Sequence, residues 1–242
     1  IGPHTRAILI CSPNNPTGTV YTDAEIDRLA AICRERDLVL IADEVYREFV
    51  YDGRKHRSAL TLAGMERQVV VVDSVSKRYS LCGARLGNIV SRNPEFMAAI
   101  MRFGQARLCP PSIEQYACTG LTEVPAAYLA GVNAEYQKRR DTVYAALAAM
   151  PGVLVRKPEG AFYICARLPV DDTNTFAEWL LSDFALEGET VMVAPADGFY
   201  ATPGLGRDEV RIAYVLEVPV LERAMKCLAT ALTTYPGRIE AA

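Results

Sequence analysis

The sequence has little histidine and no clustered cysteine, and most metal centres need one or the other. The two histidines, His4 and His56, lie far apart in polar segments that we expect to be exposed. The cysteines all stand singly, with no Cys-x-x-Cys pair: Cys11, Cys33, Cys82, Cys109, Cys118, Cys165 and Cys227. We therefore expect no metal site, and we expect reduced, mostly buried thiols, as is typical of a cytoplasmic protein.

Concentrated charge and long apolar runs are also missing. The formal net charge is −3 and the sequence pI is about 5.6, so we expect no basic surface for nucleic acid. No apolar run approaches the ~18 residues that a membrane-spanning helix needs. These absences favour a small-molecule ligand held by individual side chains.

The chain has no initiator methionine and no signal peptide, and a strand-like run begins at Ala7. We therefore expect that it starts within a fold. Its 242 residues are half apolar, which suffices for one large or two small domains.

The first half of the chain alternates between strand and helix patterns. Ala7–Ser12 and Leu38–Tyr46 are apolar runs separated by a helical repeat that Thr22 or Asp23 caps. This order predicts a right-handed parallel crossover, as in α/β sheets. Val69–Asp73 predicts a third strand, and Arg85–Val90 follows too closely for a helical crossover, so we expect it to be antiparallel.

The second half predicts a small α+β layer. Helical patterns bracket Pro110-Pro111, and a long helix runs from about 125 to 150. The later elements are a strand pair around a Pro-Glu-Gly turn, a helix over Thr175–Leu186, strands at Thr190–Ala194 and Val210–Tyr214, and a helix over Pro219–Tyr235. We divide the chain into a first domain, 1–124, and a second, 125–242.

Lys77 is the first amine after the run of valines at 69–72. A lysine at the C-terminal end of a buried strand is well placed for chemistry, and Ser74 and Arg85 flank it in sequence. A hydroxyl and a guanidinium beside one amine are what a phosphorylated aldehyde cofactor requires. The alternative, from Lys77 alone, is a solvated lysine in a surface loop.

Four motifs occur in order: NNPTG at 14–18, DEVY at 43–46, SVSK followed by Arg85, and VRIAY at 210–214. Together they resemble the class I/II aminotransferases, fold-type-I enzymes that use pyridoxal 5′-phosphate, and the pattern is aspartate-aminotransferase-like. The resemblance implies that 1–124 is an incomplete cofactor-binding large domain with a mostly parallel sheet. It implies that 125–242 is the interdomain helix and the small α+β C-terminal domain.

The resemblance also implies roles for individual residues. Lys77 would form the Schiff base with the cofactor and move the substrate proton. Asp43 would pair with the protonated pyridine nitrogen, and Tyr46 and Asn15 would hydrogen-bond the 3′ oxygen of the ring. Asp43 could otherwise be a helix cap or a surface charge.

The remaining roles concern anionic groups. Ser74 and Arg85 would bind the cofactor phosphate, and Arg211 would bind the substrate α-carboxylate as a planar fork. Arg211 could otherwise be an ordinary strand arginine. We interpret Glu44 as structural and the aromatic residues of Gly160–Tyr163 and Gly198–Tyr200 as scaffold.

The implied reaction moves an amino group between a 2-amino acid and a 2-oxo acid, in a homodimer. The family's ring-stacking aromatic residue and its glycine-rich phosphate loop lie upstream of NPTG, so we expect this chain to be a weak catalyst alone, or none. Two alternatives reuse the same pocket: a pyridoxal-phosphate lyase or decarboxylase, and the ligand-sensing domain of a transcription regulator.

Overall fold

The computed structural model describes residues 1–239 and divides into two compact units. Unit 1 comprises Ile1–Asn14, Thr19–Val132 and Glu159–Ala161. Unit 2 comprises Asn15–Gly18, Asn133–Pro158 and the described residues from Phe162 onward. Neither unit is a continuous segment, because short pieces of chain are exchanged between them.

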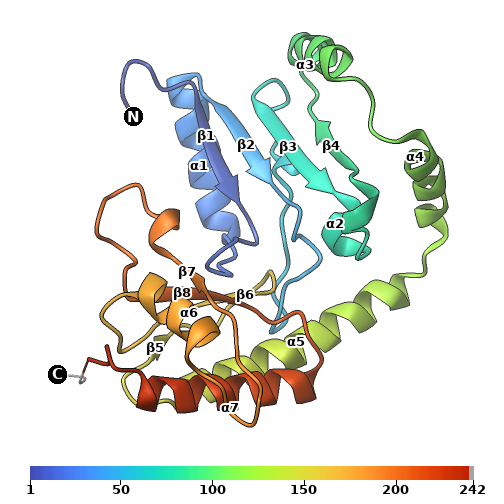
Figure 1. Ribbon diagram of the computed structural model, residues 1–242. Helices are drawn as coiled ribbons and strands as arrows, with labels where there is room; N and C mark the ends of the chain where they lie inside the picture. The colour runs from blue at the N-terminus through green and yellow to red at the C-terminus, as the bar shows by residue number, and fades with distance from the viewer. Residues whose placement is uncertain (240–242) are drawn as a thin grey trace. The chain divides into compact units, whose positions relative to one another are not determined.

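The core of unit 1 is a four-stranded sheet in the order β1-β2-β3-β4 (Figure 1). Its strands are β1 (Ala7–Cys11), β2 (Val39–Asp43), β3 (Val69–Ser74) and β4 (Gly87–Val90). The first three are parallel and β4 is antiparallel to β3, which confirms the predicted order and directions. Two predicted ends were wrong: β2 stops at Asp43 before a turn, and Arg85 precedes β4.

Helix α1 (Asp23–Arg36) connects β1 to β2 and packs against the sheet. Thr22 is its N-cap, and Glu25 completes a capping box by accepting from the Thr22 backbone N–H at 2.8 Å. Its apolar face places Ile26 and Ala30 in one buried cluster with Leu40 and other strand residues. The helical repeat read from the sequence is therefore confirmed.

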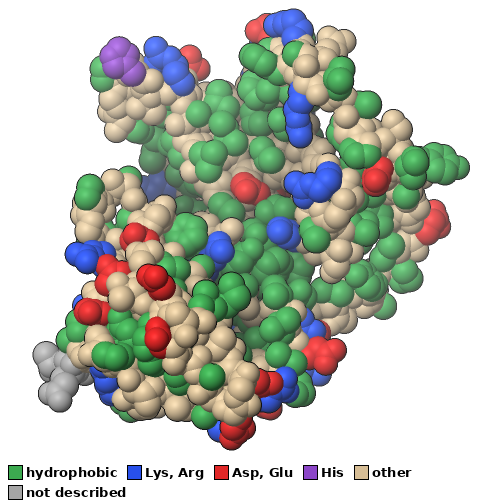
Figure 2. Space-filling model, in the orientation of Figure 1, with side chains coloured by type: hydrophobic (Ala, Val, Ile, Leu, Met, Phe, Trp, Pro, Cys, Tyr) green, Lys and Arg blue, Asp and Glu red, His purple; other side chains and the backbone are tan. Residues whose placement is uncertain are grey.

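The helices after β3 are less buried. They are α2 (Val75–Arg78), α3 (Pro94–Arg107) and α4 (Ser112–Cys118), with short 3-10 turns at Cys82–Ala84 and Thr119–Glu123; a further 3-10 turn at Ala59–Thr61 precedes β3. None of the three α-helices has a buried residue in the described chain. Phe103, Leu108, Ile113 and Tyr116 are more than 70% exposed, and Figure 2 shows hydrophobic side chains over this part of the surface. An apolar face of α3 and α4 is thus left open.

Residues Glu159–Ala161 pack into unit 1 although their neighbours on both sides belong to unit 2. The Ala161 N–H donates to the Phe49 carbonyl at 2.9 Å, the Tyr51 N–H donates to the Glu159 carbonyl at 3.0 Å, and the Tyr51 hydroxyl donates to the Ala161 carbonyl. A Cβ at Gly160 would lie 2.6 Å from the Phe49 oxygen, so only glycine fits there.

Unit 2 contains an antiparallel sheet in the order β5-β6-β8-β7. Its strands are β5 (Leu154–Val155), β6 (Tyr163–Arg167), β7 (Ala194–Pro195) and β8 (Glu209–Ala213), and its helices are α6 (Thr173–Ser182) and α7 (Val218–Thr234). Helix α5 (Ala126–Ala148) begins in unit 1 and continues into unit 2, where Val143 and Leu147 are buried.

Three sequence predictions were wrong, two of them in unit 2 and one concerning the cysteines of both units. Thr190–Ala194 is not a strand, since only Ala194 and Pro195 pair with β8. Helix α6 begins at Thr173 because the Asp172 side chain accepts from the N–H groups of its first turn. The cysteines are not mostly buried: Cys33 and Cys227 are, whereas Cys82 and Cys109 are exposed.

Neither a membrane-spanning helix nor a metal-binding cluster is found among residues 1–239. No helix in this part of the chain is long and apolar enough to cross a membrane. Among the same residues, no group of three or more His, Cys, Asp or Glu side chains could hold a metal ion.

Candidate functional site

The carboxyl ends of β1, β2 and β3 meet at one edge of the unit 1 sheet. Cys11 lies beside Asp43, and Asp43 lies beside Val72, because these strands are parallel and in register. Residues that directly follow β2 and β3 therefore emerge at the same edge. This is the edge at which α/β sheets bind ligands.

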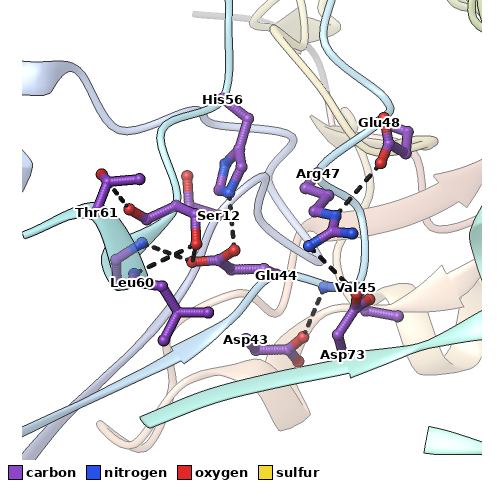
Figure 3. Close-up of polar contacts among 12 residues, drawn as sticks. Ser12, Asp43, Glu44, Val45, Arg47, Glu48, His56, Leu60, Thr61 and Asp73 are labelled. Atoms are coloured by element: carbon purple, nitrogen blue, oxygen red, sulfur yellow. Dashed lines mark hydrogen bonds and ion pairs between the residues drawn. The ribbon is translucent and has the colours of Figure 1, made fainter. Parts of the chain in front are cut away.

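Asp43 ends β2, and its carboxylate is only weakly compensated. The Val45 N–H donates to Asp43 Oδ1 at 3.1 Å, and Figure 3 shows this contact. Burial raises the pKa of Asp43, and the charges of Asp73 and Glu44 raise it further, although the bond from Val45 acts in the opposite direction. A cation beside this carboxylate would stabilise its ionised form.

Glu44 is buried at the start of the turn that follows β2, and its carboxylate is well compensated. Oε1 accepts from the Ala59 N–H at 2.7 Å and from Ser58 Oγ at 3.0 Å, and Oε2 lies 3.2 Å from His56 Nε2 (Figure 3). Burial opposes ionisation, but these partners hold the pKa of Glu44 below its ordinary value. The structural interpretation of Glu44 is confirmed, and the expectation that His56 is exposed was wrong because its side chain is 10% exposed.

Tyr46 lies in the turn after β2 and is buried, with 4% exposure. The Phe49 N–H donates to the Tyr46 carbonyl at 2.8 Å, which closes this turn. Tyr46 is therefore held at the same edge of the sheet as Asp43.

Ser74 joins the end of β3 to the loop that contains Arg85. Its Oγ accepts from the Ser76 N–H at 3.1 Å and donates to the Leu86 carbonyl at 2.7 Å. Lys77 lies one turn later in α2. Arg85 has a left-handed backbone, with φ 54°, and its Nη1 donates to the Cys82 carbonyl at 2.8 Å. A hydroxyl, an amine and a guanidinium thus come from one short stretch of unit 1.

Asn15 and Arg211 form a second group, in unit 2. Arg211 Nη1 donates to Asn15 Oδ1 at 3.1 Å. The guanidinium carbon of Arg211 lies 4.8 Å from the centre of the Tyr163 ring and 5.1 Å from that of Phe199. The two rings and the amide orient the arginine fork.

The sequence interpretation assigned Tyr163 and Phe199 to the scaffold and so missed their contact with Arg211. For Tyr163, the contact follows from a strand pairing that only the structure shows. Tyr163 lies two residues before Cys165, the residue paired with Arg211 between β6 and β8, and residues two apart on a strand share a face. Phe199 lies in a 3-10 turn, and no local pattern indicates its place.

The seven predicted site residues therefore fall into two groups. Asp43, Tyr46, Ser74, Lys77 and Arg85 belong to unit 1, and Asn15 and Arg211 belong to unit 2. Within each group, the hydrogen bonds and strand register described above account for the placement of the side chains.

The family described as aminotransferase class I and II matches residues 2–228. The chain belongs to this family. Members of this family depend on pyridoxal 5′-phosphate.

Two curated relatives illustrate how much of an aminotransferase the chain represents. It is 32% identical over 230 residues to the aspartate aminotransferase of Bacillus subtilis (strain 168), covering 92% of this chain and 56% of the relative. It is 35% identical over 229 residues to aromatic-amino-acid aminotransferase 2 of Thermococcus litoralis, covering 93% of this chain and 57% of the relative.

A solved structure agrees in fold. The aromatic aminotransferase from Pyrococcus horikoshii OT3 superposes with a TM-score of 0.83 at 32% identity, covering 96% of this chain and 61% of that chain. The chain therefore spans somewhat more than half the length of the aminotransferases that it matches.

Proposed function

We propose that the protein is a pyridoxal-phosphate-dependent aminotransferase that moves an amino group between a 2-amino acid and a 2-oxo acid. One observation carries the proposal. The poorly compensated carboxylate of Asp43 and the helical turn with Lys77 follow neighbouring parallel strands at the same sheet edge. Membership of the family adds the cofactor to this arrangement.

The unit 1 group fits the cofactor in its chemistry. Burial and the neighbouring carboxylates raise the pKa of Asp43, and the protonated ring nitrogen of the cofactor would supply a cation that favours its ionised form. Lys77 offers the amine for a covalent link, and Ser74 and Arg85 offer a hydroxyl and a guanidinium for the phosphate. When bound, the cofactor supplies an electron-accepting ring next to the amino-acid Cα.

The chain's own residues would then perform three tasks. Asp43 would keep the ring nitrogen protonated, and Tyr46 and Asn15 would hydrogen-bond the 3′ oxygen of the ring. Lys77 Nζ would accept the proton from the substrate Cα and could donate it again as the amino group is transferred. Arg211 binds the substrate α-carboxylate in a bidentate pair, already oriented by Tyr163, Phe199 and Asn15.

The direct test is absorbance spectroscopy after adding pyridoxal 5′-phosphate, with Lys77→Ala as the variant. We expect a visible band in the protein and its loss in the variant. An amino acid added alone should then convert the cofactor to its stable aminated form. A lyase or decarboxylase would instead release a product without that conversion, and a ligand sensor would bind without turnover. An unchanged band in Lys77→Ala would contradict the assignment of Lys77.

We also propose a homodimer in the cytoplasm. The exposed apolar side chains of α3 and α4 offer a surface that a second copy of the protein would cover. None of the seven cysteines, all of them in the described residues, forms a disulfide, as is usual in a reducing compartment. Light scattering coupled to size exclusion measures the oligomeric state, and a monomer at micromolar concentration would contradict the dimer.

A further inference from the structure

The turn that contains Lys77 has little packing of its own. Helix α2 consists of four residues, Val75–Arg78, and none of them is buried. An isolated helical turn of this length is unstable in water, so it must be held by contacts at its ends. Ser74 caps the first end, because its Oγ accepts from the Ser76 N–H at 3.1 Å.

Arg78 holds the other end. Its side chain is 11% exposed, and its Nη2 donates to Asp73 Oδ2 at 2.7 Å. Asp73 is the penultimate residue of β3, its side chain is 8% exposed, and its Oδ1 accepts from the Ser74 N–H at 2.7 Å. One carboxylate therefore binds both the residue before α2 and the last residue of α2.

The same guanidinium reaches the segment that follows β2. Arg78 Nε lies 3.1 Å from Glu48 Oε1, and Arg47 lies 3.3 Å from Glu48 and 3.5 Å from Asp73. Figure 3 shows the contacts of Arg47 with Glu48 and Asp73. The four side chains alternate in charge and connect the end of β3 with the turn that contains Tyr46 and follows Asp43.

We infer that Arg78 is a positioning residue, which fixes the Lys77 turn relative to the Asp43 and Tyr46 segment by pairing with both Asp73 and Glu48. The inference rests on the proposed function for the role of Lys77. A guanidinium suits this task because its planar fork contacts two carboxylates at once, whereas an ammonium is a single point charge. The Arg78–Asp73 pair in this network is largely buried, which limits the number of alternative conformations of the turn.

The network also screens Asp43. The charge of Asp73 is one cause of the raised pKa of Asp43, and Arg78 and Arg47 offset that charge. Loss of Arg78 would leave Asp73 with a single, longer ion pair to Arg47. Asp43, the carboxylate that would pair with the ring nitrogen, would then be harder to ionise.

The test compares Arg78→Met, which keeps most of the side-chain length without the charge, with Arg78→Lys and Glu48→Gln. Arg67→Met is the matched control, because Arg67 pairs with Glu95 and both side chains are largely exposed. Two quantities are measured on the cofactor-free chain. The first is the initial rate at which pyridoxal phosphate labels Lys77, trapped by borohydride and mapped by peptide mass spectrometry. The second is amide hydrogen exchange across residues 75–80.

We expect labelling to slow, and exchange to accelerate, by about tenfold in Arg78→Met, because breaking a buried ion pair is costly. Arg78→Lys should recover part of both effects, and Glu48→Gln should change each by about threefold, since one of the two pairs remains. Arg67→Met should match the parent protein. Parent-like labelling and exchange in Arg78→Met would overturn the inference.

Two outcomes need separate treatment. If Arg78→Met does not fold, Glu48→Gln becomes the deciding variant. A Lys77 labelling rate and an amide exchange rate equal to those of the parent would then overturn the inference. If the parent protein itself is not labelled at Lys77, the proposed function fails. The exchange measurement still tests whether Arg78 holds the turn, because it needs no cofactor.

Discussion

Asp43 and Glu44 are consecutive carboxylates in opposite environments. Asp43 accepts from the Val45 N–H and has a raised pKa, whereas Glu44 is contacted by Ala59, Ser58 and His56 and has a lowered one. Burial acts on both, so the difference comes from the number of donors around each carboxylate. Glu44 stabilises the fold through its partners, while the Asp43 carboxylate has fewer donors around it and could bind a cationic ligand.

Replacement of Glu44 should give the largest effect on stability. Glu44→Leu removes the acceptor for two buried donors and the partner of His56, so we expect a loss of about 3 kcal/mol in the free energy of unfolding. Urea denaturation followed by circular dichroism measures it. Glu35→Leu, at a largely exposed carboxylate, is the control. If Glu44→Leu lowered the free energy of unfolding by less than about 1 kcal/mol, Glu44 would not be more important for stability than Asp43.

Replacement of Asp43 should affect chemistry much more than stability. Asp43→Asn cannot keep a ring nitrogen protonated, so we expect the half-reaction with an amino acid to slow by about a hundredfold. The free energy of unfolding should change by less than about 1 kcal/mol. Single-turnover absorbance measures the rate, with Asp27→Asn at an exposed carboxylate as the control. A half-reaction at the parent rate would show that Asp43 does not contact the cofactor.

Removal of one donor to Glu44 should cost less than removal of its carboxylate. Ser58→Ala deletes the hydroxyl that donates to Oε1 and leaves the Ala59 N–H and His56 in place, so we expect a loss of about 1 kcal/mol in the free energy of unfolding. Ser182→Ala, at an exposed hydroxyl, is the control and should be close to neutral. An equal loss in both variants would argue against a special role for the Glu44 partners.

The pH dependence of stability should distinguish the two carboxylates by sign. The pKa of Glu44 is lowered on folding, so its stabilisation is full above about pH 4.3, its unfolded value, and is lost as the pH falls through the folded value. The pKa of Asp43 is raised, so its ionisation opposes folding above the folded value, and this penalty disappears as the pH falls to about 3.9.

Urea unfolding of Asp43→Asn and Glu44→Gln between pH 3 and 7 measures this contrast. At neutral pH, the free energy of unfolding of Asp43→Asn should exceed that of the parent, and the difference should shrink as the pH falls. The free energy of unfolding of Glu44→Gln should be lower than that of the parent at neutral pH and should approach it as the pH falls. If the differences in the free energy of unfolding between variant and parent changed with pH in the same direction for both variants, the opposite pKa shifts assigned to Asp43 and Glu44 would be contradicted.

Much of unit 1 could be predicted because local signals agree there. Val69–Val72 is a run of β-branched residues, Thr22 and Glu25 form a capping box, and the antiparallel direction of β4 follows from the short loop before it. The positions of Asp43 and Lys77 at strand ends follow from the same pattern. Their roles toward a cofactor remain predictions from the resemblance.

The rest depends on contacts between distant segments. His56 lies among polar neighbours, and its burial comes from Glu44, which precedes it by a turn and a loop. Thr190–Ala194 has the composition of a strand, but most of it finds no partner in β8. Arg78 follows β3 and Glu48 follows β2, so their pairing cannot be predicted from any local sequence pattern.

The exchange of short segments between the units has a consequence for dissecting the protein. Unit 2 contains Asn15–Gly18, and unit 1 contains Glu159–Ala161. A cut between Val132 and Asn133 would therefore yield two incomplete pieces. The later piece would carry Arg211 without the amide of Asn15, and the earlier one would lose the backbone that lies against Phe49 and Tyr51. Separating the units at this point would therefore remove native contacts from both of them.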